Sequence, residues 1–176
     1  EGDETQTDAR RGAGTYQKLT ANMERMRDRG ILFGASVTLT TENIQTVTGD
    51  AFLATLRTLG AKIAFFVDYV PADAGTEALA PGDAERDFLA RRLDELRKQP
   101  DSMIYVSFPG DEQFSGGCLA AGRGFFHINP TGGAEPCPFS PVSDTNLKNT
   151  TLFAALDSPL FSRLRASELL SGHHNG

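Results

Sequence analysis

Three short apolar segments, alternating with amphipathic stretches, constrain the fold of this chain more than any other feature. The apolar segments span residues 31–40, 61–71 and 102–109 and are rich in β-branched and aromatic side chains, as strands are. Residues 15–29, about 50–59 and 81–98 carry leucine, methionine or phenylalanine at helical spacing. The order helix–strand–helix–strand–helix–strand predicts right-handed βαβ units and an α/β fold with about three parallel strands. The first strand is apolar nearly throughout, which predicts burial on both faces.

The sequence changes character after Pro109. Residues 125–139 predict a short β-hairpin with glycines in its turn, and residues 152–170 predict a helix interrupted at Ser158-Pro159. The first twelve residues and residues 41–49 are polar and predict loops. We therefore expect a boundary between residues 1–109 and residues 110–176.

Composition narrows the class of partner. The chain has 176 residues and a formal net charge of -6, which disfavours binding to nucleic acid or to an anionic membrane. It has no apolar run of the roughly 18–20 residues that cross a bilayer, and its first residues show no signal-peptide pattern. These features predict a cytoplasmic protein that binds neither nucleic acid nor membrane. The first residue is Glu and not Met, so we expect a piece of a longer chain.

Candidate functional residues follow from the expected sheet, because the loops after the carboxyl ends of parallel strands usually carry the site. Taken alone, each candidate is more often a solvated loop residue or a cap than a functional residue. The Arg10-Arg11 pair could bind a carboxylate or a phosphate through its guanidinium groups. The candidates are Glu1, Asp3, Glu4, Arg10, Arg11, Thr41, Glu42, Asn43, Asp68, Tyr69, Asp111 and Glu112.

Of the two cysteines, Cys118 precedes the expected hairpin and Cys137 lies on its second arm. Glycines allow the chain to turn between them, and Pro136 and Pro138 stiffen the second arm. Such a pair could bind a metal, pack as two buried thiols or, less compatibly with a chain that lacks a secretion signal, form a disulfide. Two thiolates do not complete a zinc or iron–sulfur site, which usually takes four ligands.

The other motifs carry little functional information. His127 is expected on a strand, on the face opposite its two neighbours, where a hydrogen-bonded or surface role is commoner than metal binding. His173 and His174 lie in the terminal tail. The sequence has no phosphate-binding loop, no dinucleotide fingerprint and no nucleophile elbow.

The order of the motifs resembles radical S-adenosylmethionine enzymes over about residues 1–150. Glu1-Gly2 resemble the end of that family's Ser-x-Asp/Glu-Gly motif, and the stretch up to Ile44 resembles the middle of the barrel. The spacing of Cys118, Gly132 and Cys137 is similar to the opening of the SPASM-type auxiliary cluster motif. Thirteen residues separate Cys118 from Gly132, and four separate Gly132 from Cys137.

The resemblance implies a fold, a cofactor and site residues. Residues 1–109 would be the second half of a partial (β/α)6 TIM-like barrel, and residues 110–176 a SPASM-like hairpin with a helical extension. Such enzymes use a 4Fe-4S cluster to cleave S-adenosylmethionine to a 5′-deoxyadenosyl radical, often for peptide modification. The resemblance assigns cofactor-binding roles to Glu1, Arg10, Arg11, Ser36, Thr38, Asn43, Asp68 and Tyr69, and metal binding to Cys118 and Cys137.

The departures from the family pattern give further expectations. The Cys-x3-Cys-x2-Cys loop that binds the catalytic cluster is absent, and no cysteine follows Cys137. This chain alone is therefore expected to be inactive and to hold no catalytic residue. The alternatives are a stand-alone α/β binding module with a structural zinc or thiol site, and a structural domain with two buried thiols. If the sheet is a piece of a larger one, its exposed edge predicts a dimer.

Overall fold

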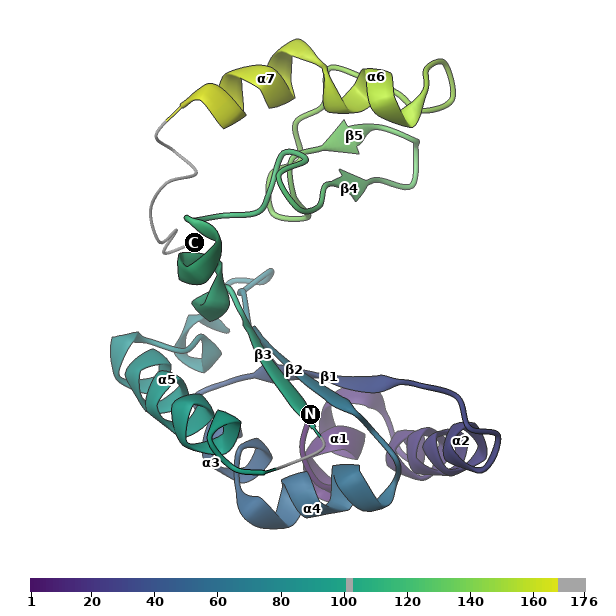
Figure 1. Ribbon diagram of the computed structural model, residues 1–176, viewed down its shortest axis with the longest axis vertical. Helices are drawn as coiled ribbons and strands as arrows, with labels where there is room; N and C mark the ends of the chain where they lie inside the picture. The colour runs from purple at the N-terminus through teal and green to yellow at the C-terminus, as the bar shows by residue number, and fades with distance from the viewer. Residues whose placement is uncertain (101–102, 168–176) are drawn as a thin grey trace. The chain divides into compact units, whose positions relative to one another are not determined.

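The computed structural model describes residues 1–100 and 103–167, which belong to two compact units, Glu1–Gly110 and Asp111–Gly176 (Figure 1). The division follows Gly110, next to the boundary expected after Pro109. The predicted tail histidines, His173 and His174, and the last residues of the expected 152–170 helix lie outside the described residues. Among the described residues, no helix has the length and apolar character needed to span a membrane.

The first unit contains the predicted parallel sheet. Its strands are β1 (Gly34–Leu39), β2 (Ile63–Asp68) and β3 (Ile104–Phe108), in the order β1-β2-β3. Ser36 lies beside Phe65, and Phe65 beside Val106, so equivalent side chains of the three strands share a face. The mixed α/β class and the three parallel strands predicted from the sequence are confirmed.

Within the described part of the first unit, five α-helices and one short 3-10 helix accompany this sheet. Because sequential parallel strands are joined by right-handed crossovers, the two crossover helices α4 and α5 lie on the same side of the sheet (Figure 1). The helices are α1 (Glu4–Arg11), α2 (Thr15–Asp28), α3 (Ile44–Val47), α4 (Asp50–Thr58) and α5 (Asp83–Arg97), with the 3-10 helix η1 (Glu77–Leu79) between β2 and α5.

The core of the first unit lies on one face of the sheet only. Leu39 and Phe66 of that face are fully buried against Leu53 of α4 and Leu93 of α5. Side chains of the other face are half-buried or exposed, including Ser36 on β1. The expectation that the first strand is buried on both faces is therefore wrong. The helices cover the face of β1 that carries Val37 and Leu39, and they leave the face that carries Ser36 and Thr38 uncovered.

Two predicted loops contain helices. The first twelve residues were expected to form a loop, yet α1 occupies Glu4–Arg11 and is capped by Asp3, whose carboxylate accepts the Gln6 N–H at 2.9 Å. Only Thr7 of this helix is buried, so it has no apolar stripe that sequence periodicity could detect. The expected 41–49 loop contains α3, a single turn whose Ile44 and Val47 join the core.

The second unit is smaller and is built around a two-stranded antiparallel hairpin. Ala120, Ala121, Ala134, Ala155 and Phe161 form its buried core. The predicted hairpin and the helix interruption at Ser158-Pro159 are confirmed, although the strands are only two residues long. The elements are the 3-10 helix η2 (Gly110–Ser115), β4 (His127–Ile128), β5 (Ala134–Glu135), α6 (Leu152–Leu156) and α7 (Pro159–Ala166).

Candidate functional site

A carboxylate and two guanidinium groups meet at the start of the chain. Helix α1 runs from Glu4 to Arg11 and brings its last two arginines back to Glu1. Arg11 donates from Nε to Glu1 Oε1 at 2.7 Å, and Arg10 is paired with the other carboxylate oxygen. The Glu1 side chain is 6% exposed whereas that of Arg11 is 54% exposed. The carboxylate is thus enclosed, and the guanidinium of Arg11 stays accessible to an anion from solvent.

Asn43 attaches this group to the carboxyl end of β1. Its Nδ2 donates to the carbonyl oxygens of Glu1 and Thr38, both at 2.9 Å. Its Oδ1 accepts the Thr40 N–H at 2.8 Å. Asn43 is almost fully buried, and its side chain fixes the first residue of the chain against the end of the strand.

Tyr69 adds an aromatic face to the same place. It directly follows β2, and its N–H donates to the Leu39 carbonyl at the end of β1. The guanidinium carbon of Arg10 lies 5.2 Å from the centre of the Tyr69 ring, within cation–π distance. Tyr69 also donates its hydroxyl to Thr76 Oγ1 at 3.0 Å, which fixes the ring.

The structure therefore brings together five residues singled out in the sequence: Glu1, Arg10, Arg11, Asn43 and Tyr69. We call this set the strand-end cluster. It carries two guanidinium groups against one side-chain carboxylate, so its side chains have an excess of one positive charge at neutral pH. An arrangement of this kind can bind a carboxylate or phosphate beside an aromatic ring.

Asp68, expected beside Tyr69, lies on the other side of the sheet. It shares the buried side of β2 with Ala64 and Phe66, and Arg86 of α5 donates from Nε to its carboxylate at 2.9 Å. Burial raises the pKa of Asp68 above its ordinary value, and the hydrogen bond from Arg86 partly offsets this effect. Adjacent strand residues point to opposite faces, which separates Asp68 from the strand-end cluster.

Ser36 and Thr38 lie on the face of β1 opposite Val37 and Leu39, which are buried in the core. Ser36 is exposed, and Thr38 contributes its main-chain carbonyl to Asn43. Both therefore lie along the sheet face that is not covered by the core helices. Their predicted cofactor-binding roles stay predictions.

The hairpin of the second unit brings the two cysteine-bearing segments together. The Ala121 N–H donates to the Pro136 carbonyl at 3.0 Å, and both cysteines are partly buried against the same core. Burial raises the pKa of the Cys118 thiol, and the charges of Glu112 and Cys137 act in the same direction. Both thiols are free. Their predicted metal binding stays a prediction, because the described residues include no group of three or more histidine, cysteine or acidic side chains that could hold a metal ion.

Glu135 and Arg86, near these sites, were not singled out in the sequence, and the role of Glu112 was not predicted. Glu112 is buried and accepts the Leu119 N–H at 2.9 Å beside Cys118, although the sequence identified it only as a loop candidate. Glu135 is buried on β5 and accepts from Asn129 at 2.7 Å. Arg86 is spaced like a surface residue of α5, so the sequence offers no signal for its pairing with Asp68.

No known protein-family model matches the chain, and no curated protein matches it either.

Proposed function

We propose that this chain is the C-terminal part of a radical S-adenosylmethionine enzyme. In this proposal residues 1–109 are the second half of a partial (β/α)6 barrel, and residues 110–176 are a SPASM-like extension. The observation that carries the proposal is the strand-end cluster. It gathers residues from three separate stretches of the first unit at the carboxyl ends of β1 and β2, where functional sites of parallel α/β folds usually lie.

The architecture of the sheet supports the same proposal. A sheet in the order β1-β2-β3 with both crossover helices on one side is what a barrel segment would have. The opposite face carries Ser36 and Thr38 and would be the inner surface of the barrel. That surface leads to the strand-end cluster, where the exposed guanidinium of Arg11 suits an amino-acid carboxylate such as that of S-adenosylmethionine.

The cysteines of this chain do not suffice for an iron–sulfur cluster. Such clusters usually take four cysteine thiolates, and Cys118 and Cys137 supply two. Radical chemistry belongs in this proposal to the full-length parent, with a peptide or small molecule as its substrate. In this proposal the isolated chain does not cleave S-adenosylmethionine and need not hold a cofactor.

The proposal is tested by the mass of the polypeptide in its native cells. A species near twice 18.9 kDa, with a Cys-x3-Cys-x2-Cys loop in its upstream peptides, is expected. A native species of about 18.9 kDa would contradict the proposal and favour a stand-alone binding module. Formation of 5′-deoxyadenosine by residues 1–176 under anaerobic, reducing conditions would contradict the part of the proposal that assigns radical chemistry to the full-length parent only.

Thiol alkylation tests the alternative of a zinc or thiol site in the second unit. Ready modification of Cys118 and Cys137 is expected if the pair is an unfilled half-site. Protection that a chelator removes would favour bound metal, and protection that a chelator leaves unchanged would favour two buried structural thiols.

A further inference from the structure

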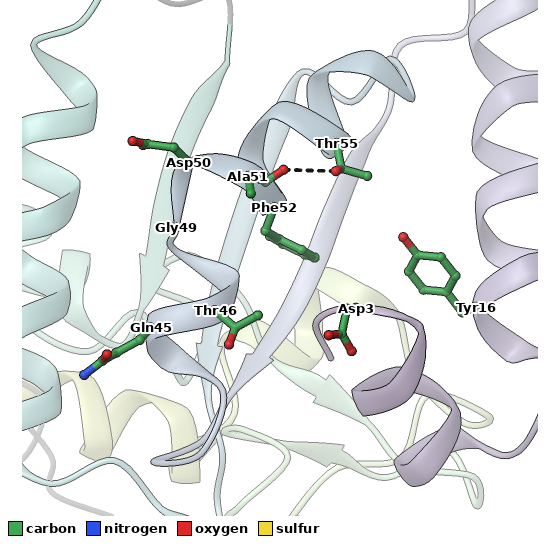
Figure 2. Close-up of a pocket in the computed structure, with 9 residues that line it drawn as sticks. All are labelled: Asp3, Tyr16, Gln45, Thr46, Gly49, Asp50, Ala51, Phe52 and Thr55. Carbon is green, nitrogen blue, oxygen red and sulfur yellow. Dashed lines mark hydrogen bonds between the residues drawn. The ribbon is translucent and has the colours of Figure 1, made fainter.

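A cleft of about 450 Å³ opens in the first unit, among the helices (Figure 2). The beginnings of α1 and α2 supply one side of it, and α3 with the first turns of α4 supply the other. None of its lining residues belongs to the strand-end cluster. The cleft is lined by Asp3, Tyr16, Gln45, Thr46, Gly49, Asp50, Ala51, Phe52 and Thr55.

Two aromatic rings point into this cleft, and an aspartate lines it. Figure 2 shows the Phe52 ring extending from α4 and the Tyr16 ring from α2 toward the space between these helices, with Asp3 beside that space. Gln45 and Asp50 point away from it in the same view. Asp50 is moreover paired with Arg92 of α5, so Asp3 supplies the negative charge on this side of the cleft.

Both Asp3 and Tyr16 are held by backbone contacts that leave their functional groups available. Asp3 uses Oδ1 to cap α1 by accepting the Gln6 N–H at 2.9 Å. The main-chain N–H of Tyr16 donates to Asp8 at 2.8 Å, which fixes the start of α2. Within the described part of the chain, Asp3 has no ion-pair partner, and no lysine, arginine or histidine lines the cleft. The carboxylate is therefore positioned without a cation to neutralise it.

The charges and aromatic rings that line the cleft favour a positively charged ligand. The amino end of α4 contributes a partial positive charge, but Asp50 occupies its first turn and opposes it. An anion would also meet the carboxylate of Asp3. A cation, in contrast, would gain both from the faces of the aromatic rings and from the carboxylate.

We propose that this cleft binds a guanidinium group, carried by an arginine side chain or by a small guanidine. A guanidinium is flat, stacks on aromatic rings and directs its N–H groups in one plane toward a carboxylate. It could lie against Phe52 and Tyr16 while it donates to Asp3. This site is separate from the strand-end cluster and does not depend on the proposed function.

The test is a titration of the full chain, followed by NMR or calorimetry, with Nα-acetyl-arginine amide. Nα-acetyl-citrulline amide, a neutral molecule of nearly the same shape, is the matched ligand control, and methylguanidine distinguishes a small guanidine from an arginine side chain. We expect arginine amide to bind and citrulline amide to bind at least tenfold more weakly, since a hydrogen bond to a charged group contributes more than one to a neutral group. Tighter binding of methylguanidine than of the arginine amide would identify a small guanidine as the ligand. Equal binding of arginine and citrulline would overturn the proposal, as would no binding of either guanidine.

Asp3→Asn is the decisive variant, because Asn caps a helix as well as Asp does and removes only the charge. It is expected to weaken binding of arginine amide roughly tenfold while the circular dichroism of the protein is unchanged. Glu24→Gln, which removes one exposed carboxylate from α2 away from the cleft, is the matched control and is expected to leave binding unchanged. An equal loss in both variants would show a general effect of net charge and would overturn the site. Phe52→Leu keeps apolar bulk but removes the aromatic face, and unchanged binding in it would exclude stacking on Phe52.

Discussion

Asn43 joins two segments that are far apart in the sequence. Its side chain makes three hydrogen bonds to main-chain groups, two of them to carbonyls of residues 1 and 38 and one to the N–H of residue 40. An amide can do this because it offers two donors and an acceptor, whereas a carboxylate of the same shape offers acceptors only. The hydrogen bonds of Asn43 within the protein therefore account for an asparagine at this position after the strand, without reference to a ligand.

Replacing Asn43 tests this role. Asn43→Ala leaves buried main-chain groups without their partner, so we expect it to lower the free energy of unfolding by about 2–4 kcal/mol. Urea denaturation followed by circular dichroism measures the change. Asn22→Ala, at an exposed position in the middle of α2, is the control and should change stability little or increase it, because Ala favours helices. A loss in Asn43→Ala no larger than in this control would contradict the structural role.

Because the pKa of Asp68 is raised in the folded protein, the free energy of unfolding depends on pH, and the direction of this dependence can be predicted. Burial raises its pKa above the ordinary value of 3.8, so the folded protein binds this proton more tightly than the unfolded chain does. The contribution of Asp68 to the free energy of unfolding is therefore greatest below that value and falls as the pH rises through the folded-state pKa. Asp68→Asn removes this dependence, and its stability relative to the wild type should increase as the pH rises through this interval.

Urea unfolding of the wild type and Asp68→Asn over a series of acidic pH values measures that difference. The same series with Asp87→Asn, an exposed carboxyl of α5, reports what the loss of one surface charge does by itself. If the stability of Asp68→Asn relative to the wild type fell as the pH rose, the interaction with Arg86 would outweigh burial and the predicted sign would be wrong.

At the scale of elements, the hairpin between the two cysteines depends on Gly132. This residue has a φ of +93°, and a Cβ there would lie 2.8 Å from Asn146 Oδ1. Gly132→Ala is expected to destabilise the second unit by more than the roughly 1–2 kcal/mol that a left-handed conformation costs by itself. The matched control is Gly75→Ala, because Gly75 has a nearly equal φ of +92° and no atom within 4 Å of the added Cβ.

Thermal unfolding of the two variants distinguishes the cost of the backbone conformation from the cost of the contact between the added Cβ and Asn146. We expect both to be less stable than the wild type, with the larger loss in Gly132→Ala. Equal losses would mean that Asn146 moves aside at no cost and that only the backbone conformation requires glycine at position 132.

The elements that the sequence predicts well are those with a periodic apolar pattern. Helices α4 and α5 bury leucines at helical spacing, and the three strands are apolar, so both types follow from local sequence. Helix α1 has no such pattern, although Asp3 followed three residues later by Gln6 is a capping signal that could have indicated its start. Its identification needs the contacts to Glu1 and α2, which are tertiary.

The candidate site was predictable as a region but not in its orientation. The carboxyl ends of β1 and β2 identify Asn43 and Tyr69 as neighbours, whereas Arg10 reaches them from α1, which precedes the described strands. That Asp68 faces the helices follows from alternation along β2, but both faces of this strand are apolar in sequence, so the buried face could not be assigned. The cleft between Tyr16 and Phe52 has no sequence signal, since aromatic residues at helical spacing usually indicate a core.

At the scale of the whole molecule, the edge of the sheet at β1 is the place where we expect copies of the chain to pair. Within the described residues β1 pairs only with β2, so its other edge has main-chain groups available for a further strand. Leu32, just before β1, is 76% exposed, which adds apolar surface at the same edge. Exposed edges with apolar neighbours tend to pair with another chain.

We therefore expect a dimer that forms through β1, detectable by sedimentation velocity as the concentration rises from micromolar to millimolar. Ser36→Lys should shift the equilibrium toward the monomer, because lysine on an edge strand brings like charges together across a symmetric pair. Gln17→Lys, an equal change of charge at an exposed position of α2, is the control and should leave the equilibrium in place. A wild-type chain that stays monomeric throughout this range would contradict edge pairing, and an equal effect of the two lysines would place the contact elsewhere.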